Sequence, residues 1–402
     1  MKIVREADVP ICQDENSLMD RMNTDSFVSG SWLDEISRSR SLESLKDPLR
    51  RSYPFLDKSG LPKRLAILGA GAEGRRLADI CMRHDIEVVA IFDNDATKRG
   101  IVIGKHRVSP SDAIGSMDKS VPIIVASHRV LGATQSLEAM GFHVAPFALL
   151  QVLAPEIFRP HMFYDGLIED IYSNKACYLE LAEKFSDEES VRVLDRVLGY
   201  RLTLDAKLLA EVVNWDLYNF SGLLQFDEDE VYVDGGAFDG DSVRMFIDNV
   251  SDHYDRVLAF EPDPKTFERL SHNLKKLPKV DLFNAGLHRS SGTLGFNNDG
   301  SRGAIISADG ECSIQVTSID EVLNGDRASF IKMNIEGAEL EALKGSAKTI
   351  AAWRPKMAIS VYHRPGDLYE IPKLVHELGS DYRLYLRQHD GGIIETVLYA
   401  FV

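Results

Sequence analysis

Short aliphatic runs alternate with amphipathic stretches in two separate parts of the chain. In the first part, RLAILGA (64–70), VVAIFDND (88–95) and PIIVASH (122–128) predict buried strands, and apolar residues at helical spacing lie between them. Strands that alternate with helices are typical of a parallel α/β sheet. We therefore expect one such sheet upstream of about residue 160.

The same alternation returns from Glu230 to the end of the sequence. Seven runs predict strands: VYVD (231–234), VLAFEP (257–262), VDLFNAG (280–286), FIKMNIE (330–336), KMAISVYH (356–363), YRLYLRQ (382–388) and IETVLYAFV (394–402). Helices are expected between them at Ser242–Val250, Pro264–Leu277, Ala338–Ala352 and Asp367–Gly379. A glycine-rich excursion at 291–315 predicts a hairpin.

The pattern divides the chain into four parts. These are a helical arm (1–60), a Rossmann-like domain with a GxGxxG loop (61–160), a helical connector (161–229) and a second Rossmann-like domain (230–402). The arm either packs on a domain or another subunit, or it is a loosely attached leader. Within the connector, Ser186 with Glu189 three residues later predicts a helix N-terminus. The expected fold class is α/β, with two Rossmann-like domains in tandem joined by a helical connector.

Charge and cysteine content narrow the class of protein. The net charge of −16 argues against a non-specific nucleic-acid binder, because such a protein needs a positive surface. The cysteines lie far apart with no CxxC pair, which excludes a zinc knuckle and argues against a disulfide framework. They are Cys12, Cys81, Cys177 and Cys312. No apolar run approaches the length of a membrane span, and the first residues lack the apolar core of a signal peptide. We expect a cytoplasmic protein with no membrane partner.

The loop LAILGAGAEGRR follows the first predicted strand. Gly69, Gly71 and Gly74 match the GxGxxG pattern, whose glycines allow a tight turn and bring a phosphate close to a helix N-terminus. Asp93, at the end of the next strand, stands where an acid that binds ribose would be expected. The loop therefore predicts a second nucleotide site. A purely structural domain is the alternative, since the one histidine that follows, His128, equally suits a structural role.

The loop VYVDGGAFDGDS is acidic instead. It holds three aspartates and no basic residue, so it would repel a pyrophosphate and attract a cation. S-adenosylmethionine fits, because it carries a sulfonium and an ammonium group and no phosphate. On the next strand Glu261, followed by Pro262, is placed to accept hydrogen bonds from two ribose hydroxyls. The residues expected to bind this cofactor are Asp234, Gly235, Gly236, Ala237, Asp239, Gly240, Asp241, Glu261 and Pro262.

Four motifs, in this order, resemble one known family. VYVDGGAFDGDS, AFEPDPKTFERLSHNL, TSIDEVL and FIKMNIEGAELEALKGSAKTIAAWRPKMAISVYHRPGDL are similar to motifs of the FkbM family of S-adenosylmethionine-dependent methyltransferases, over about 230–402. The resemblance implies the class I methyltransferase fold, a mainly parallel seven-stranded sheet whose last strand is antiparallel. It also implies methylation of a hydroxyl group, often on a sugar or a natural product.

The resemblance places Asn334, Glu336 and Gly337 beside the reacting centre. The family pattern Lys-Ile-Asp-Val-Glu-Gly becomes Lys-Met-Asn-Ile-Glu-Gly here, and the amide of Asn334 cannot serve as a base. The base that removes the acceptor proton would be His363, at the end of the fifth strand, or Glu336. A structural histidine is the alternative for His363. Asn334, Glu336 and Glu339 offer oxygen atoms to a metal, but we expect no metal because Glu339 suits the start of a helix.

The favoured hypothesis is an O-methyltransferase acting on a hydroxyl of a sugar, a nucleotide-linked sugar or a natural product. One alternative is a non-catalytic protein that binds S-adenosylmethionine or a nucleotide sugar. This alternative stays open because Asn334 has an amide where the family pattern has an acid. Another is an NAD-dependent oxidoreductase that uses the first loop. The expected partner is a small molecule and not a nucleic acid, and a homo-oligomer stays open.

Overall fold

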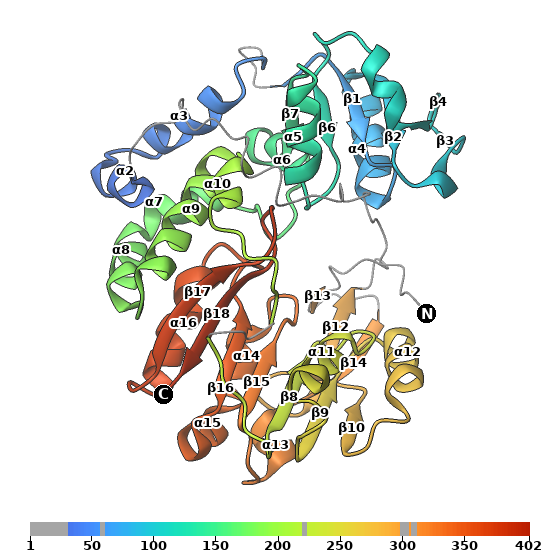
Figure 1. Ribbon diagram of the computed structural model, residues 1–402. Coiled ribbons are helices and arrows are strands. Elements are labelled where there is room, and N and C mark those ends of the chain that lie inside the picture. Colours follow the sequence, from blue (N-terminus) through green and yellow to red (C-terminus); the bar gives the residue numbers. More distant parts are fainter. Residues whose placement is uncertain (1–30, 57–60, 219–222, 298–304, 307–311) are drawn as a thin grey trace. The chain divides into compact units, whose positions relative to one another are not determined.

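The computed structural model describes residues 31–56, 61–218, 223–297, 305–306 and 312–402 (Figure 1). The chain forms two compact units, and each is described by itself. The first unit comprises residues 1–168 and 198–207, and the second comprises 169–197 and 208–402. Within the described ranges, no helix has the length and apolar character that would let it span a bilayer. Cys12 and the tip of the predicted hairpin lie outside the described residues.

A five-stranded sheet in the order β5-β2-β1-β6-β7 forms the centre of the first unit, and every neighbouring pair in it is parallel. Its strands are β1 (Arg64–Leu68), β2 (Glu87–Asp93), β5 (Ser109–Pro110), β6 (Ile123–Val125) and β7 (Val144–Pro146). The three strands predicted upstream of residue 160 are confirmed as β1, β2 and β6. Leu65, Ala66 and Ile67 are fully buried, as parallel strands covered on both faces require.

Helices and short elements complete this unit. They are α2 (Trp32–Arg38), α3 (Leu42–Ser52), α4 (Ala72–Arg83), α5 (Leu131–Ala139), α6 (Ala148–Leu153), η1 (Ala96–Lys98), η2 (Ser111–Ser116), and the pair β3 (Val102–Ile103) and β4 (His106–Arg107). In the predicted arm, Ser31 and Ser41 begin α2 and α3 by accepting the N–H groups of Asp34 and Ser44.

Four helices follow one another in the predicted connector: α7 (Leu167–Ser173), α8 (Lys175–Lys184), α9 (Glu188–Thr203) and α10 (Lys207–Ala210). The cap predicted for α9 is off by one residue. The side chain of Asp187 accepts the N–H of Ser190 at 2.8 Å, whereas the hydroxyl of Ser186 accepts the N–H of Leu384 at 3.2 Å. A tertiary contact thus takes the serine, and the neighbouring aspartate caps the helix.

The second unit contains a seven-stranded sheet in the order β10-β9-β8-β15-β16-β18-β17. Its strands are β8 (Val231–Gly235), β9 (Arg256–Phe260), β10 (Val280–Phe283), β15 (Phe330–Met333), β16 (Lys356–Ser360), β17 (Arg383–Gln388) and β18 (Thr396–Phe401). β18 runs antiparallel to its two neighbours, β16 and β17, and the other neighbouring pairs are parallel. All seven predicted strands are present, and the methyltransferase-like topology expected from the resemblance is confirmed.

The helices of this sheet are α11 (Asp241–Asn249), α12 (Pro264–Leu274), α13 (Ile319–Leu323), α14 (Glu339–Lys344), α15 (Ala347–Trp353) and α16 (Asp367–Leu378). The single helix predicted at 338–352 is wrong, because the chain breaks there into α14 and α15. Gly345 stands at the break, and a Cβ on it would lie 2.2 Å from the carbonyl oxygen of His288. This close approach of another backbone segment interrupts the helix.

The predicted hairpin at 291–315 is confirmed in its described part. Antiparallel β12 (Gly292–Asn297) and β14 (Cys312–Thr317) pair with each other, and β11 (Gly286–Leu287) and β13 (Ile305–Ile306) complete a four-stranded sheet. Ile314 and Val316 are buried there against Leu294.

A buried ion pair joins the two central strands of the large sheet. The ammonium group of Lys332, on β15, lies 2.8 Å from Oδ1 of Asp234, on β8, and both side chains are at most 4% exposed. The same ammonium group donates to the carbonyl oxygens of Gly235 at 3.2 Å and Gly236 at 2.8 Å. Oδ2 of Asp234 accepts the hydroxyl of Ser242 at 2.6 Å. These contacts fix the chain where it leaves β8.

Replacing Lys332 with methionine should destabilise the protein, because the change leaves the Asp234 carboxylate buried without a counter-charge. Loss of one partner of a buried pair costs about 3–5 kcal/mol. Urea unfolding monitored by circular dichroism measures this loss. Lys344→Met is the matched control, since Lys344 pairs with Glu341 at a half-exposed position, and should cost no more than about 1 kcal/mol. Equal losses of unfolding free energy in the two variants would show that the buried ion pair stabilises the protein no more than the surface pair does.

Candidate active site

A glycine turn follows β8 at the carboxyl edge of the parallel strands. Gly236 has φ +75°, and a Cβ on it would lie 2.0 Å from the carbonyl oxygen of Asn334. Gly240 has φ +91° and begins α11. The N–H groups of Gly236 and Ala237 donate to the carbonyl oxygen of Phe260. Positive φ and close backbone approach explain why the turn needs glycine at both positions.

The three aspartates of this turn occupy different environments. Asp234 is fully buried, and each of its carboxylate oxygens has a protein donor, Lys332 or Ser242. Asp239 is half-buried and Asp241 is exposed. Asp234 therefore anchors the turn, and only Asp239 and Asp241 add negative charge that a ligand could meet. The counter-charge is not evident from the sequence, because Lys332 lies 98 residues away from Asp234 along the chain.

Glu261 directly follows β9, beside the glycine turn. Its Oε2 accepts the N–H of Phe238 at 3.1 Å, and its Oε1 accepts the N–H of Asp263 at 3.0 Å. The Glu261 side chain is 8% exposed. The amide of Asn284 donates to the carbonyl oxygens of Glu261 and Pro262, so the backbone of this corner is also held.

Burial raises the pKa of Glu261 to about 7, although the two backbone N–H groups favour the charged form. Each carboxylate oxygen has two lone pairs, and one backbone donor uses only one of them. The carboxylate can therefore accept two further hydrogen bonds, one on each oxygen. Vicinal hydroxyl groups match this arrangement.

The loop after β15 lies against the glycine turn. The N–H of Asn334 donates to the carbonyl oxygen of Gly235, and Oδ1 of Asn334 accepts the hydroxyl of Tyr362 at 3.1 Å. Glu336 has φ +56°, a conformation that L-residues with side chains seldom adopt. The structure thus brings Asn334 next to the predicted cofactor turn and presents Glu336 on a strained tip.

His363 is fully buried between two carboxylates. Its Nδ1 lies 3.0 Å from Oε1 of Glu339, and its Nε2 lies 3.6 Å from Oε2 of Glu336. Burial alone would lower the pKa of His363, but the charges of Glu339 and Glu336 outweigh it and raise the pKa to about 9. At neutral pH the ring is an imidazolium, which can donate hydrogen bonds but cannot accept a proton. This state favours a positioning role for His363 over a role as base.

Two acidic residues lie next to His363: Glu339, which the sequence placed at the start of a helix, and Asp367, which it indicated only as the first residue of a helix. Oε1 of Glu339 also accepts the N–H of Ile335 at 2.8 Å, so Glu339 supports the loop at the start of α14. Asp367 is 2% exposed at the start of α16, and its Oδ2 accepts the N–H of Arg364 at 2.8 Å. The short separation of His363 and Asp367, four residues along the chain, is the feature of the sequence that could have indicated that they lie close together.

The glycine loop of the first unit follows a similar plan. Gly69 has φ +111°, and a Cβ on Gly74 would lie 1.8 Å from the carbonyl oxygen of Gly69, whereas Gly71 faces open space. Asp93 accepts the N–H of Ala70 at 2.6 Å and the N–H of Asp95 at 2.8 Å, as Glu261 accepts those of Phe238 and Asp263. In each unit, the acid at the end of the second strand ties the glycine loop to its own turn.

Asp93 also forms an ion pair, because the ammonium group of Lys98 lies 3.4 Å from its Oδ2. His128 lies in an aromatic cluster with Phe147, Phe163 and Tyr164. Burial lowers its pKa to about 3, which favours the structural alternative for this histidine.

Part of this chain is similar to known methyltransferases. Residues 234–390 match the family model described as the Methyltransferase FkbM domain. The hexuronic acid methyltransferase AglP of Haloferax volcanii is 26% identical over 200 residues, which cover 46% of this chain and 80% of that protein. The crystal structure of Methyltransferase FkbM from Methylobacillus flagellatus KT is 25% identical, with a TM-score of 0.69 over 90% of this chain and 100% of that one.

The matched range begins at Asp234, near the end of β8, and ends at Asp390, just after β17. It contains Glu261, Asn334, Glu336 and His363. Residues 234–390 therefore match the FkbM methyltransferase domain, and the candidate site lies within this matched range.

Proposed function

We propose that this protein transfers the methyl group of S-adenosylmethionine to a hydroxyl group of a sugar. The observation that carries the proposal is the Glu261 carboxylate, buried beside a glycine turn with one accepting position left on each oxygen. Support for a sugar acceptor comes from the relative named as a hexuronic acid methyltransferase.

The residues around the turn fit such a cofactor. Glu261 would accept the two ribose hydroxyls, and the turn from Gly236 to Gly240 would hold the methionine end. Asp239 and Asp241 would attract the ammonium group, since Asp234 is already neutralised by Lys332. S-adenosylmethionine would supply an electrophilic methyl group.

Glu336 is the proposed acceptor of the hydroxyl proton. Its side chain is 27% exposed, and Nε2 of His363, 3.6 Å away, would hold the carboxylate in one orientation. Asn334 would position the loop through Tyr362 and Gly235. Alignment of the hydroxyl oxygen and removal of its proton are the two contributions that these residues would make.

We further propose that the first unit is a second Rossmann-like domain and that its loop binds a nucleotide. The shared pattern of donors to Asp93 and Glu261 supports this proposal. Lys98 would add positive charge near a phosphate. Calorimetric titration with UDP-glucose and with NAD tests it: binding of one of them should be lost in Asp93→Asn, and absence of binding of either would refute it.

Replacing Glu261 with glutamine should weaken binding of S-adenosylmethionine about 10- to 100-fold. The amide loses the charge and one acceptor, and hydrogen bonds to charged groups contribute about 1.5–3 kcal/mol each. Isothermal titration calorimetry measures the affinity. Glu268→Gln removes an exposed carboxylate on α12 and should bind as the wild type does. Equal affinities for Glu261→Gln and the wild type would show that Glu261 does not bind the ribose.

Binding of S-adenosylmethionine should also depend on pH through Glu261. Its pKa of about 7 in the free protein means that it becomes protonated as the pH falls, and it then loses accepting capacity. Affinity should therefore be nearly constant above pH 8 and fall about tenfold between pH 8 and pH 6. Titrations of Glu261→Gln over the same range correct for protonation of the ligand itself. A pH profile identical in both proteins contradicts the assignment.

Methyl transfer should be detectable with S-adenosylmethionine that carries a labelled methyl group and a panel of sugars that includes hexuronic acids. A hexuronic acid offers hydroxyls and a carboxylate, so the product is treated with mild alkali, which cleaves a methyl ester but not a methyl ether. We expect an alkali-stable product. Glu336→Gln should lower kcat about 10²- to 10⁴-fold with cofactor binding unchanged, whereas Glu377→Gln, exposed on α16, should not.

Two results of this assay would reject the proposal. An alkali-labile product would show that the enzyme methylates a carboxylate, to give a methyl ester, and not a hydroxyl group. Cofactor binding with no transfer to any sugar would favour the non-catalytic binding protein, and the amide of Asn334 would then be its best explanation.

A further inference from the structure

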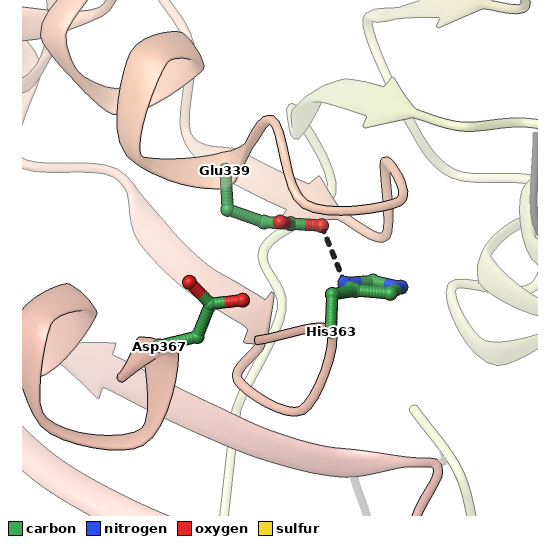
Figure 2. Close-up of side chains that lie close together, drawn as sticks. All are labelled: Glu339, His363 and Asp367. Atoms are coloured by element: carbon green, nitrogen blue, oxygen red, sulfur yellow. Dashed lines mark ion pairs between the residues drawn. The ribbon is translucent and has the colours of Figure 1, made fainter. Parts of the chain in front are cut away.

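Three buried side chains converge behind the loop that carries Glu336. Glu339 begins α14, His363 follows β16 and Asp367 begins α16; they are 1%, 0% and 2% exposed. Figure 2 shows the carboxylate of Glu339 directed at the near edge of the His363 ring, with the carboxylate of Asp367 beside them, each from a separate element. One nitrogen or oxygen atom of each residue lies within 4.8 Å of such an atom on the other two.

The charges of this cluster do not balance. Two buried carboxylates face one imidazole ring, which carries at most one positive charge even when protonated, and Glu336 adds a third carboxylate 3.6 Å from the ring. Isolated buried carboxylates are costly unless they are paired or coordinate a metal. The carboxylates that stabilise the imidazolium would also stabilise a divalent cation, which would displace the proton from the ring.

A second, independent observation comes from Glu339. Its Oε1 accepts the N–H of Ile335 and faces His363, but its Oε2 is buried and has no hydrogen-bond partner among the described residues. A buried carboxylate oxygen without a donor is rare, and an ion is one of its ordinary explanations.

We propose that Glu339, His363 and Asp367 bind a first-row divalent cation such as Zn²⁺. Mixed imidazole and carboxylate ligands suit these metals, whereas Mg²⁺ and Ca²⁺ prefer oxygen ligands alone. The three ligands proposed here differ from Asn334, Glu336 and Glu339, the residues that the sequence suggested. The side chain of Asn334 hydrogen-bonds to Tyr362, and the fold brings His363 and Asp367 to Glu339.

The bound cation would act by position. Glu339 already holds the loop through the N–H of Ile335, and His363 faces Glu336. A metal on these ligands would link α14, α16 and the end of β16 behind the loop tip. Its burial, with ligands no more than 2% exposed, favours a site that fixes the loop over one that binds substrate. Cation binding does not depend on methyl transfer, so the two proposals fail separately.

The test is a Co²⁺ titration of the full-length chain after treatment with EDTA and gel filtration, without S-adenosylmethionine or sugar. Co²⁺ with a histidine ligand gives visible d–d absorption bands. We expect saturation at one Co²⁺ per chain, displacement by one equivalent of Zn²⁺, and a higher thermal unfolding midpoint with Zn²⁺ than with EDTA.

Variants locate the site. Asp367→Asn and Glu339→Gln should each weaken Co²⁺ binding at least 100-fold and abolish the effect of Zn²⁺ on the unfolding midpoint. Asp381→Asn is the matched control, because Asp381 is exposed and pairs with Arg354 at the surface. It should bind as the wild type does. Circular dichroism establishes that each variant is folded.

Two outcomes overturn the proposal. The first is the absence of saturable Co²⁺ binding and of any Zn²⁺ effect in the wild-type protein, which requires no variant; a proton shared between the two carboxyl groups would then balance the cluster. The second is saturable binding that survives in a folded Asp367→Asn or Glu339→Gln protein, which would place the cation elsewhere.

Discussion

The buried contact between Lys332 and Asp234 is the constraint on which the rest of the site depends. It joins β8 to β15 in the middle of the sheet, and the same ammonium group binds the carbonyl oxygens of Gly235 and Gly236. The turn that follows can therefore bend sharply between the two strands, with Gly236 pressed against the backbone of Asn334. The apparent acidity of the turn in the sequence is partly cancelled by this lysine, and the charge that remains stands at its outer end, on Asp239 and Asp241.

Around this anchor, the carboxyl ends of the parallel strands bring the functional groups together. β9 delivers Glu261 to the turn, β15 delivers Asn334 and Glu336, and β16 delivers His363. Each acid is held by backbone N–H groups or by a charged neighbour, so the carboxylates lie in fixed orientations. The first unit repeats one part of this plan with Asp93, and it lacks an equivalent of the group formed by Glu336, Glu339 and His363 in its described residues.

The sequence predicted the parts of this arrangement that depend on local pattern. Aliphatic runs located all seven strands of the large sheet, and the glycine motifs located both loops. It missed what depends on contacts between distant residues. The carbonyl oxygen of His288 breaks the helix at Gly345, and the N–H of Leu384 takes the hydroxyl of Ser186, so that Asp187 becomes the cap. The protonation state of His363 could not be predicted from the sequence either, because its pKa is raised by Glu339 and Glu336, which lie next to it only in the folded chain.

A crystal structure of the protein with S-adenosylhomocysteine would test the proposed cofactor position between the glycine turn and Glu261. We expect density for the ligand along Gly236–Gly240, with the two ribose hydroxyls within hydrogen-bond distance of Oε1 and Oε2 of Glu261. Density at Gly69–Gly74 in the first unit, or a ribose that does not contact Glu261, would contradict it.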